Sequence, residues 1–381
     1  MVDGGPGRRE DRADGLTLVV LGGGPAQRHA IDAAHALDVR TVVCDANPAR
    51  GDVAVSSEDV EGVLRTARDA AARGLIAPGT DWPVRVAAEV AQELDLAHPL
   101  DLSTAQLATD KLAQRERLSA DGVPQPAWSL AGPPSFPAVV KAADRQGQRA
   151  MSIVSHGDEL AAAADRARRG SRAGVVLYEE FVPGPEVTVN GFAVDGHHHV
   201  VAVTARDHFE GAPGVAQRHV YPSGHDDAAA ARTADAAIAA LGIRSGPTYT
   251  QIVLSPDGPR VMEVAARLGG GHDSELVRMV TGVDLAAAAV RAALGIPVGE
   301  RDLEPSPGPA CVIEFLRPPE GTLAGVSGPP EATFYHPPGH VYGPLRVATD
   351  RAGYVITTAP TREEALVGAR TAAGAVRFEV T

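Results

Sequence analysis

The chain has 381 residues, of which 44% are hydrophobic and 22% are charged, and its formal net charge is −13 at pH 7. This length allows two or three domains, each with its own hydrophobic core. The acidic balance argues against a broad surface for nucleic acid or acidic membranes, so a phosphorylated ligand must meet a local cluster of basic groups.

Two further features bear on the cellular compartment. Cys44 and Cys311 lie in apolar runs typical of strands, which predicts buried thiols in a reducing cytosol. No apolar stretch reaches the length that spans a bilayer. The sequence therefore predicts a cytoplasmic protein without nucleic-acid or membrane partners.

The first part of the chain alternates between strands and helices. Residues 1–15 are rich in Gly, Arg and Asp and are predicted to be disordered. The predicted strands are 16–21, 41–44 and 74–77, and the predicted helices begin near 26 or span 60–73 and 81–94. This order is typical of an α/β, Rossmann-like domain with a parallel sheet, which we place at residues 16–105.

After the prolines at 124–134, runs of strands with occasional helices indicate an α+β arrangement. Strands are predicted at 137–141, 151–155, 174–181, 186–194, 199–206, 247–254 and 259–265, with helices at 157–169, 226–241, 274–281, 284–294 and 361–374. We divide this part into segments 106–190 and 191–304 and, after a second proline-rich linker, a small C-terminal domain at 305–381.

The glycine-rich turn after the first strand suggests one possible cofactor. Gly22 and Gly24 precede a helix, and Asp45 ends the second strand, an order that resembles a nicotinamide-dinucleotide-binding unit. Gln27 stands where the third glycine would be. The alternative is that the glycines simply make a tight strand-to-helix turn.

The two lysines are distinctive. Of the 35 basic residues only Lys111 and Lys141 are lysine, a bias that usually reflects codon composition. A lysine kept against such a bias is a candidate for a chemical need that arginine does not meet, because the ammonium is a compact point charge and the guanidinium a wide planar fork.

Four segments carry residue types suited to nucleotide chemistry. Their order along the chain is Thr109-Asp-Lys111, Pro137-Ala-Val-Val-Lys141 with a polar loop at 144–149, Leu177-Tyr-Glu-Glu-Phe-Val-Pro-Gly-Pro-Glu186, and Val261-Met-Glu-Val-Ala-Ala-Arg-Leu-Gly-Gly-Gly271. Lysines at element ends and a loop with free N–H groups suit a triphosphate. A carboxylate beside an arginine suits Mg²⁺ next to a developing anion.

These segments together resemble the ATP-grasp superfamily, and the chain is most similar to carboxylate–amine ligases of the bacterial L-amino-acid ligase kind. The C-terminal stretches Phe315-Leu-Arg-Pro-Pro-Glu-Gly321 and Gly353-Tyr-Val-Ile-Thr-Thr-Ala359 support that choice. The resemblance implies an ATP-grasp fold, with a lid and first half at 106–190 and a core at 191–304. It also implies ATP and Mg²⁺ as cofactors.

The resemblance assigns roles to individual residues. It implies that Lys111 and Lys141 bind the phosphates of ATP and that Glu186 binds the ribose. It also implies that Glu179 lies at the adenine, which Glu180 and Val182 contact through their backbone. Glu263 and Gln251 are the implied Mg²⁺ ligands, Glu263 and Arg267 the catalytic residues, and His219, Gly270 and Gly271 the substrate contacts. From the residues alone, the glycines at 269–271 are equally compatible with a simple turn.

Three positions depart from the family pattern. Gln251 replaces an acidic Mg²⁺ ligand, Ala265 replaces an asparagine, and Ala150 replaces a glycine. These changes leave open whether one or two Mg²⁺ ions bind. His197, His198 and His199 follow a predicted hairpin turn, where solvent-exposed turn residues are favoured over a metal site.

The implied activity is amide-bond formation between a small carboxylate and an amine, through an acyl phosphate, with release of ADP and phosphate. Two alternatives stay open. One is an ATP-grasp enzyme that uses bicarbonate, as in carboxylation or purine biosynthesis, and the other is a non-catalytic protein that binds ATP or a dinucleotide. A homodimer is compatible with the resemblance.

Overall fold

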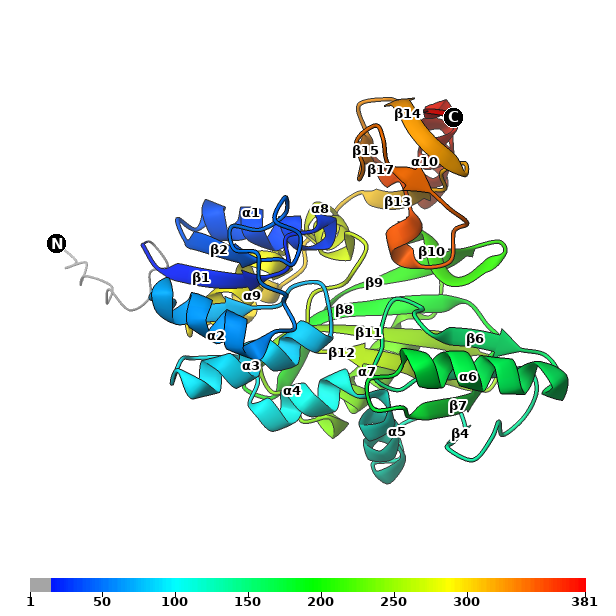
Figure 1. Cartoon of the computed structure of the whole chain (residues 1–381), viewed down its shortest axis with the longest axis horizontal. Helices are drawn as coiled ribbons and strands as arrows, with labels where there is room; N and C mark the ends of the chain where they lie inside the picture. Colours follow the sequence, from blue (N-terminus) through cyan, green and yellow to red (C-terminus); the bar gives the residue numbers. More distant parts are fainter. Residues whose placement is uncertain (1–14) are drawn as a thin grey trace.

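The computed structural model describes residues 15–381, so the predicted disordered segment 1–15 lies, apart from Gly15, outside the described residues. Figure 1 shows an N-terminal α/β part beside a large sheet, and the C-terminal part of the chain lies at one end of that sheet. Within residues 15–381 no helix combines the length and apolarity that a membrane crossing needs.

The N-terminal part is a parallel sheet of order β2-β1-β3, which confirms the predicted parallel arrangement. Its elements are β1 (Thr17–Leu21), β2 (Arg40–Cys44), β3 (Gly74–Ile76), the turn η2 (Pro25–Gln27), and the helices α1 (Arg28–Ala36), α2 (Val60–Asp69) and α3 (Trp82–Glu93). Because side chains alternate across a strand, Leu18 and Val20 pack towards α1, whereas Val19 and Leu21 pack towards α2 and α3. A helix late in the chain, α9 (Leu285–Ala293), completes the α1 side.

Two helices that the sequence reading missed connect this part to the rest. They are α4 (Leu102–Thr109) and α5 (Lys111–Ala120). Each begins at an aspartate whose carboxylate caps it: Asp101 accepts from Thr104 N at 2.8 Å, and Asp110 accepts from Leu112 N at 2.8 Å. N-cap aspartates were therefore the available signal.

A four-stranded antiparallel sheet, of order β4-β7-β5-β6, forms a separate layer. Its elements are β4 (Trp128–Ser129), β5 (Ala138–Ala142), β6 (Met151–Val154) and β7 (Val176–Glu180), with η3 (Gly157–Glu159) and α6 (Leu160–Gly170). Alanines of α6 pack on Ala138 and Val140 in one small apolar core. The predicted strands and helix of this segment are confirmed.

The large sheet has eight antiparallel strands in the order β12-β11-β8-β9-β10-β13-β17-β15. Its strands are β8 (Glu186–Val194), β9 (His197–Phe209), β10 (Ala212–Tyr221), β11 (Gly246–Ser255), β12 (Gly258–Ala265), β13 (Ala310–Leu316), β15 (Ala332–Phe334) and β17 (Gly353–Ala359). The sequence reading missed β10, because Pro213 and Gly214 normally interrupt strands. The register between β9 and β10 does shift there.

Helices and a small sheet complete the molecule. They are α7 (Asp227–Ala240), α8 (Asp273–Thr281) and α10 (Arg362–Ala375), the turns η4 (Glu300–Leu303) and η5 (Ala348–Asp350), and β14 (Gly321–Ser327), β16 (Val341–Tyr342) and β18 (Arg377–Val380). Along β8, Val187 and Val189 pack with alanines of α7, while the alternating Thr188 and Asn190 are also fully buried. The second face of β8 therefore carries buried polar side chains.

Two smaller predictions can be compared directly with the structure. Cys44 and Cys311 are both free and buried, as expected. His197, His198 and His199 belong to β9 rather than to the turn, which is made by Asp195 and Gly196 at φ of 50° and 88°. His198 Nδ1 lies 2.7 Å from Asp235 Oδ1, and within residues 15–381 no group of three or more potential metal-ligating side chains assembles.

Candidate functional site

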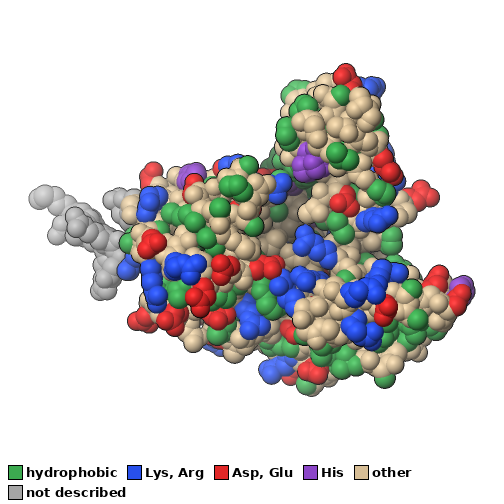
Figure 2. All heavy atoms as spheres, in the orientation of Figure 1, with side chains coloured by type: hydrophobic (Ala, Val, Ile, Leu, Met, Phe, Trp, Pro, Cys, Tyr) green, Lys and Arg blue, Asp and Glu red, His purple; other side chains and the backbone are tan. Residues whose placement is uncertain are grey.

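The site lies where the N-terminal part, the four-stranded sheet and the large sheet meet. Figure 2 shows a hollow in the middle of this face with Lys and Arg side chains gathered around it. One cavity of about 130 Å³ is lined by six of the predicted residues: Lys111, Lys141, Glu179, Glu186, Gln251 and Glu263. Residues far apart in the sequence, on α5, β5, β7, β8, β11 and β12, thus share one wall.

A buried charge cluster adjoins this cavity. One carboxylate oxygen of Glu179, Oε1, lies 2.7 Å from Arg115 Nε, and the other, Oε2, lies 2.7 Å from Lys141 Nζ. Burial alone would raise the pKa of Glu179, but the two cations outweigh it and lower the pKa to about 2. Burial lowers the pKa of Lys141 to about 8. Glu179 thus holds Lys141 in place, and its predicted adenine contact stays a prediction.

Arg115 joins three elements to this cluster. Besides Glu179 on β7, it donates to the carbonyls of Val261 at 3.2 Å and Met262 at 2.6 Å on β12. Met262 is the extra residue of a bulge, since Gln251 pairs with Glu263 but Ile252 pairs with Val261. Bulges re-aim side chains next to active sites, so Arg115 supports the backbone that presents Glu263.

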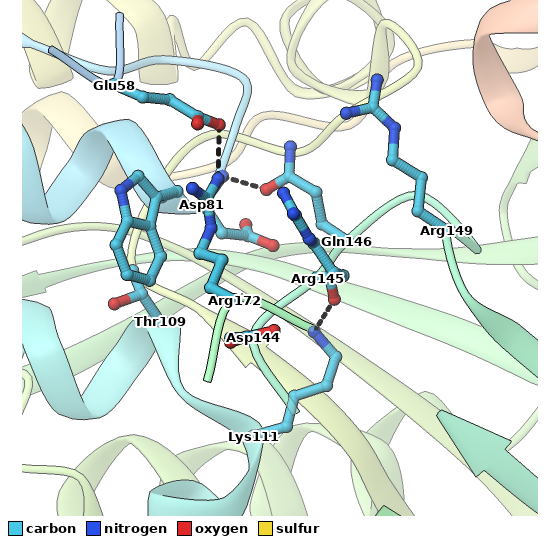
Figure 3. Close-up of a pocket in the computed structure, with 10 residues that line it drawn as sticks. Glu58, Asp81, Thr109, Lys111, Asp144, Arg145, Gln146, Arg149 and Arg172 are labelled. Carbon is cyan, nitrogen blue, oxygen red and sulfur yellow. Dashed lines mark hydrogen bonds and ion pairs between the residues drawn. The ribbon is translucent and has the colours of Figure 1, made fainter. Parts of the chain in front are cut away.

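Lys111, the other lysine of the chain, is paired with Glu263, a predicted metal ligand. Lys111 Nζ lies 2.7 Å from Glu263 Oε1 and donates to the carbonyl of Arg145 at 2.7 Å. Figure 3 shows this lysine pointing at the loop between β5 and β6. Burial opposes the charged form of Lys111, but Glu263 and Asp81 outweigh it and raise its pKa.

Of the remaining predicted nucleotide contacts, Glu186 lines the cavity, whereas Glu180 and Val182 do not. Glu186 is paired with Arg206 at 2.5 Å and with His208 at 3.1 Å. Glu180 accepts a hydrogen bond from Ala127 N at 3.1 Å, and Val182 is buried just after β7. Their proposed contacts with ribose and adenine stay predictions.

The loop at 144–150 contributes residues to the wall of the cavity. Gly147, Gln148 and Ala150 have φ of 66°, 64° and 57°, so Ala150 adopts the left-handed conformation at the position where the family pattern has glycine. Arg172 reaches across to the N-terminal part, lying 2.6 Å from Glu58 and over the Trp82 ring at 4.1 Å. Figure 3 shows Arg172 and its ion pair with Glu58 close to Lys111 and the loop residues Arg145 and Gln146.

A second cavity, of about 240 Å³, adjoins the first. Its wall includes His219, Arg267, Gly270 and Gly271, and it shares Gln251 and Glu263 with the first cavity. The two predicted metal ligands therefore stand at the boundary between a lysine-rich cavity and a cavity formed by the predicted substrate residues.

The predicted catalytic residue Arg267 and the predicted substrate contact His219 are each held by an acid that the sequence analysis did not single out. Arg267 Nε lies 2.5 Å from Asp81 Oδ1 in the N-terminal part. His219 Nδ1 lies 2.7 Å from Asp273 Oδ1, which is fully buried. Asp81 follows a parallel strand, at the sheet edge where ligands of α/β proteins bind, so its position was an available signal.

The geometry does not favour a dinucleotide at the first glycine turn. Asp45 accepts a hydrogen bond from Gly23 N at 2.9 Å, so its carboxylate is directed to the turn itself. A Cβ atom at Gly23 would stand 1.8 Å from the carbonyl oxygen of Arg50, which closes over the turn. The glycine allows close backbone packing where a pyrophosphate would need open space.

The wall residues fit Mg²⁺ with a nucleotide. Mg²⁺ is usually held by one or two carboxylates together with substrate phosphates and waters. Glu263 supplies a carboxylate, and its cross-strand neighbour Gln251 supplies a side-chain carbonyl. Lys111 and Lys141 border the same cavity and suit phosphate oxygens.

The Arg115 cluster leads to a stability prediction. Arg115→Met should lower the free energy of unfolding by about 3–5 kcal/mol, because it leaves Glu179 buried with one cation fewer. Urea denaturation measures the change. Arg117→Met on the same helix is the control, since its partner Asp121 is exposed and the pair is worth at most ~1 kcal/mol. Equal effects of the two changes would contradict the assigned role of Arg115.

Comparison with known proteins identifies the family. Residues 104–301, more than half of the chain, match the model of the carbamoyl-phosphate synthase L chain ATP-binding domain. Residues 314–381 match the L-amino acid ligase C-terminal domain 2. Protein y4rH of Sinorhizobium fredii, itself uncharacterized, is 26% identical over 303 residues, which cover 73% of this chain and 62% of that protein. The chain therefore spans less than two thirds of that relative.

Solved structures share the fold. L-amino acid ligase from Bacillus licheniformis has a TM-score of 0.84 at 20% identity, covering 97% of this chain and 99% of that one. The biotin carboxylase domain of the Hydrogenobacter thermophilus 2-oxoglutarate carboxylase, solved with MgADP and bicarbonate, has a TM-score of 0.75 at 16% identity, covering 96% and 90%. The resemblance seen in the sequence is confirmed: the chain belongs to the ATP-grasp superfamily of ATP-dependent ligases, which use ATP and Mg²⁺.

Proposed function

We propose that the protein is a carboxylate–amine ligase that forms an amide bond through an acyl phosphate. The observation that carries this proposal is the pair of adjoining cavities, which share Gln251 and Glu263. The lysine-rich cavity suits the nucleotide. The arginine- and histidine-lined cavity suits a substrate that becomes more negative as it is phosphorylated.

In the proposed reaction a carboxylate oxygen attacks the terminal phosphorus of ATP, and the bond from that phosphorus to ADP breaks. The amine nitrogen then attacks the acyl carbon, phosphate leaves, and the nitrogen loses a proton. Lys111 and Lys141 would hold the phosphates, and Arg267, fixed by Asp81, would face the acyl phosphate. Mg²⁺ would supply charge neutralisation at the phosphates.

An acyl phosphate must be kept from water. The loop at 144–150 lines both cavities, and Arg172 contacts Glu58 and Trp82 of the N-terminal part. A loop and an inter-part contact in this place support a ligase reaction that proceeds inside a covered site.

Two measurements test the function. Mg-ATP should raise the melting temperature and NADPH should not, because binding to the folded state alone stabilises it. Phosphate release should require a carboxylate and an amine together. Stabilisation by NADPH and not by ATP would contradict the ligase proposal. Release that depends on bicarbonate would favour a carboxylating enzyme, and no release with any mixture would favour a non-catalytic protein.

A further inference from the structure

Arg351, from the C-terminal strands, reaches into the substrate cavity. It follows η5 and is 8% exposed, and together with Ala348 and Thr349 it borders the cavity that also holds His219 and Arg267. Its guanidinium lies 3.7 Å from the Phe315 ring centroid and donates to the carbonyls of Ala348 at 2.8 Å and Ala216 at 3.4 Å. The C-terminal part therefore contributes a cation to the site.

Three arginines that border the substrate cavity are buried or half-buried, and they differ in whether an acid is paired with them. Arg206 is paired with Glu186, and Arg267 is paired with Asp81. Among the described residues no carboxylate lies within ion-pair distance of Arg351. Burial, reinforced by Arg206, lowers the pKa of Arg351 to about 10. A buried cation without an anion is unfavourable, and an anionic ligand would relieve that cost.

The position of Arg351 indicates which anion fits. Arg351, Arg267 and His219 border the substrate cavity but not the lysine-rich cavity, whereas Gln251 and Glu263 border both. An anion at Arg351 is thus held away from the lysines that are suited to the nucleotide phosphates. The acyl group that is phosphorylated must lie near the shared boundary, so it is a different group from the one at Arg351.

We infer that Arg351 binds a second, non-reacting carboxylate, which one of the two substrates carries and which the product retains. This inference rests on the proposed function. It narrows the substrates to pairs in which the amine is an amino acid with a free carboxylate or the acyl donor is a dicarboxylate. Arg suits this task because its planar fork matches a carboxylate with two parallel hydrogen bonds.

A structural role for Arg351 predicts different behaviour. Its bonds to Ala348 and Ala216 join η5 to β10, and their loss would lower stability whatever the substrate is. Only a carboxylate contact makes the effect of the substitution depend on the charge of the substrate. The test therefore compares each substrate with its neutral amide.

The experiment first screens wild-type protein for phosphate release with Mg-ATP and pairs of common L-amino acids and dicarboxylates. For the best pair, the non-reacting carboxylate of each substrate is replaced in turn by a primary amide. One of these replacements should lower wild-type kcat/KM by roughly 10- to 100-fold. The substrate that shows this loss carries the carboxylate at Arg351.

With the natural substrate pair, Arg351→Met should lower kcat/KM by the same factor as the amide replacement does in the wild type. With the amide substrate, kcat/KM of Arg351→Met should equal that of the wild type. Arg351→Lys should retain part of the discrimination and guards against a variant that fails to fold. Arg317→Met is the matched control, since Arg317 also stacks on a ring, Phe209 at 5.1 Å, but borders neither cavity. The KM for Mg-ATP should be unchanged in all three.

The possible failures are distinguishable. In one case the wild-type protein releases phosphate, but Arg351→Met lowers kcat/KM equally for the acid and the amide substrate. The inference about Arg351 is then wrong, and the ligase proposal stands. If wild-type protein releases no phosphate with any pair, the proposed function fails, and the inference fails with it. Discrimination that survives unchanged in both Arg351 variants also overturns the inference.

Discussion

Lys141→Arg is expected to lower kcat/KM nearly as much as Lys141→Ala, by roughly 10²- to 10³-fold, although the positive charge is kept. The ammonium of Lys141 is buried, and it lies 2.7 Å from a Glu179 oxygen whose partner oxygen already binds Arg115. A guanidinium is longer and planar and would meet Arg115 across the same carboxylate. Steady-state phosphate release measures the loss, and thermal melting checks that both variants fold.

Chemical modification tests the two lysines directly, because the other 33 basic residues are arginine. An amine-selective reagent should modify Lys141 before Lys111, since the pKa of Lys141 is lowered to about 8 and that of Lys111 is raised. Saturating Mg-ATP should protect both lysines and the activity in peptide mapping. Equal modification with and without Mg-ATP, or full activity of the doubly modified protein, would show that neither lysine holds phosphate.

The second large effect concerns the metal ligand. Glu263→Gln should abolish turnover, because Gln251 opposite it is already neutral and the pair would then carry no carboxylate. One charge at ~4 Å and an effective dielectric near 20 is on the order of 4 kcal/mol before desolvation, or roughly a thousandfold in rate. Phosphate release measured against Mg²⁺ concentration should show the loss.

Two companion variants sharpen this test. Gln251→Glu adds a carboxylate at the same boundary and should bind Mg²⁺ as tightly as the wild type or more tightly. Glu314→Gln is the control, since Glu314 is buried and paired with Arg218 at 2.7 Å on the same sheet but borders neither cavity. Full activity in Glu263→Gln would refute the metal assignment.

Much of the fold could be predicted from the sequence, because the patterns that indicate strands, helices and turns are local. Apolar runs typical of strands, alanine-rich helices and proline or glycine breaks predicted most elements, including the parallel arrangement of β1, β2 and β3. The misses also have local causes. The helices α4 and α5 are short and weakly amphipathic, and β10 contains Pro213 and Gly214.

The residues of the candidate site could be predicted from the sequence in part. Predicted residues on six different elements line one cavity, because lysines and carboxylates at element ends converge where the sheets meet. The roles of Glu179 and Glu186 were less predictable. Glu179 is paired with Arg115 and Lys141, and Glu186 is paired with Arg206 and His208. A motif that names the acid does not name its partner.

The sequence by itself determined the superfamily, the chemical types in the site and the unusual position of the two lysines, because these depend on residue identity and order along the chain. Only the tertiary structure decided which charges are paired and that the buried Arg351 has no acidic partner among the described residues. Arg115 meets Glu179 across 64 residues, and Arg267 meets Asp81 across 186. Pairings over such separations are set by how sheets and helices pack, and no local pattern encodes them.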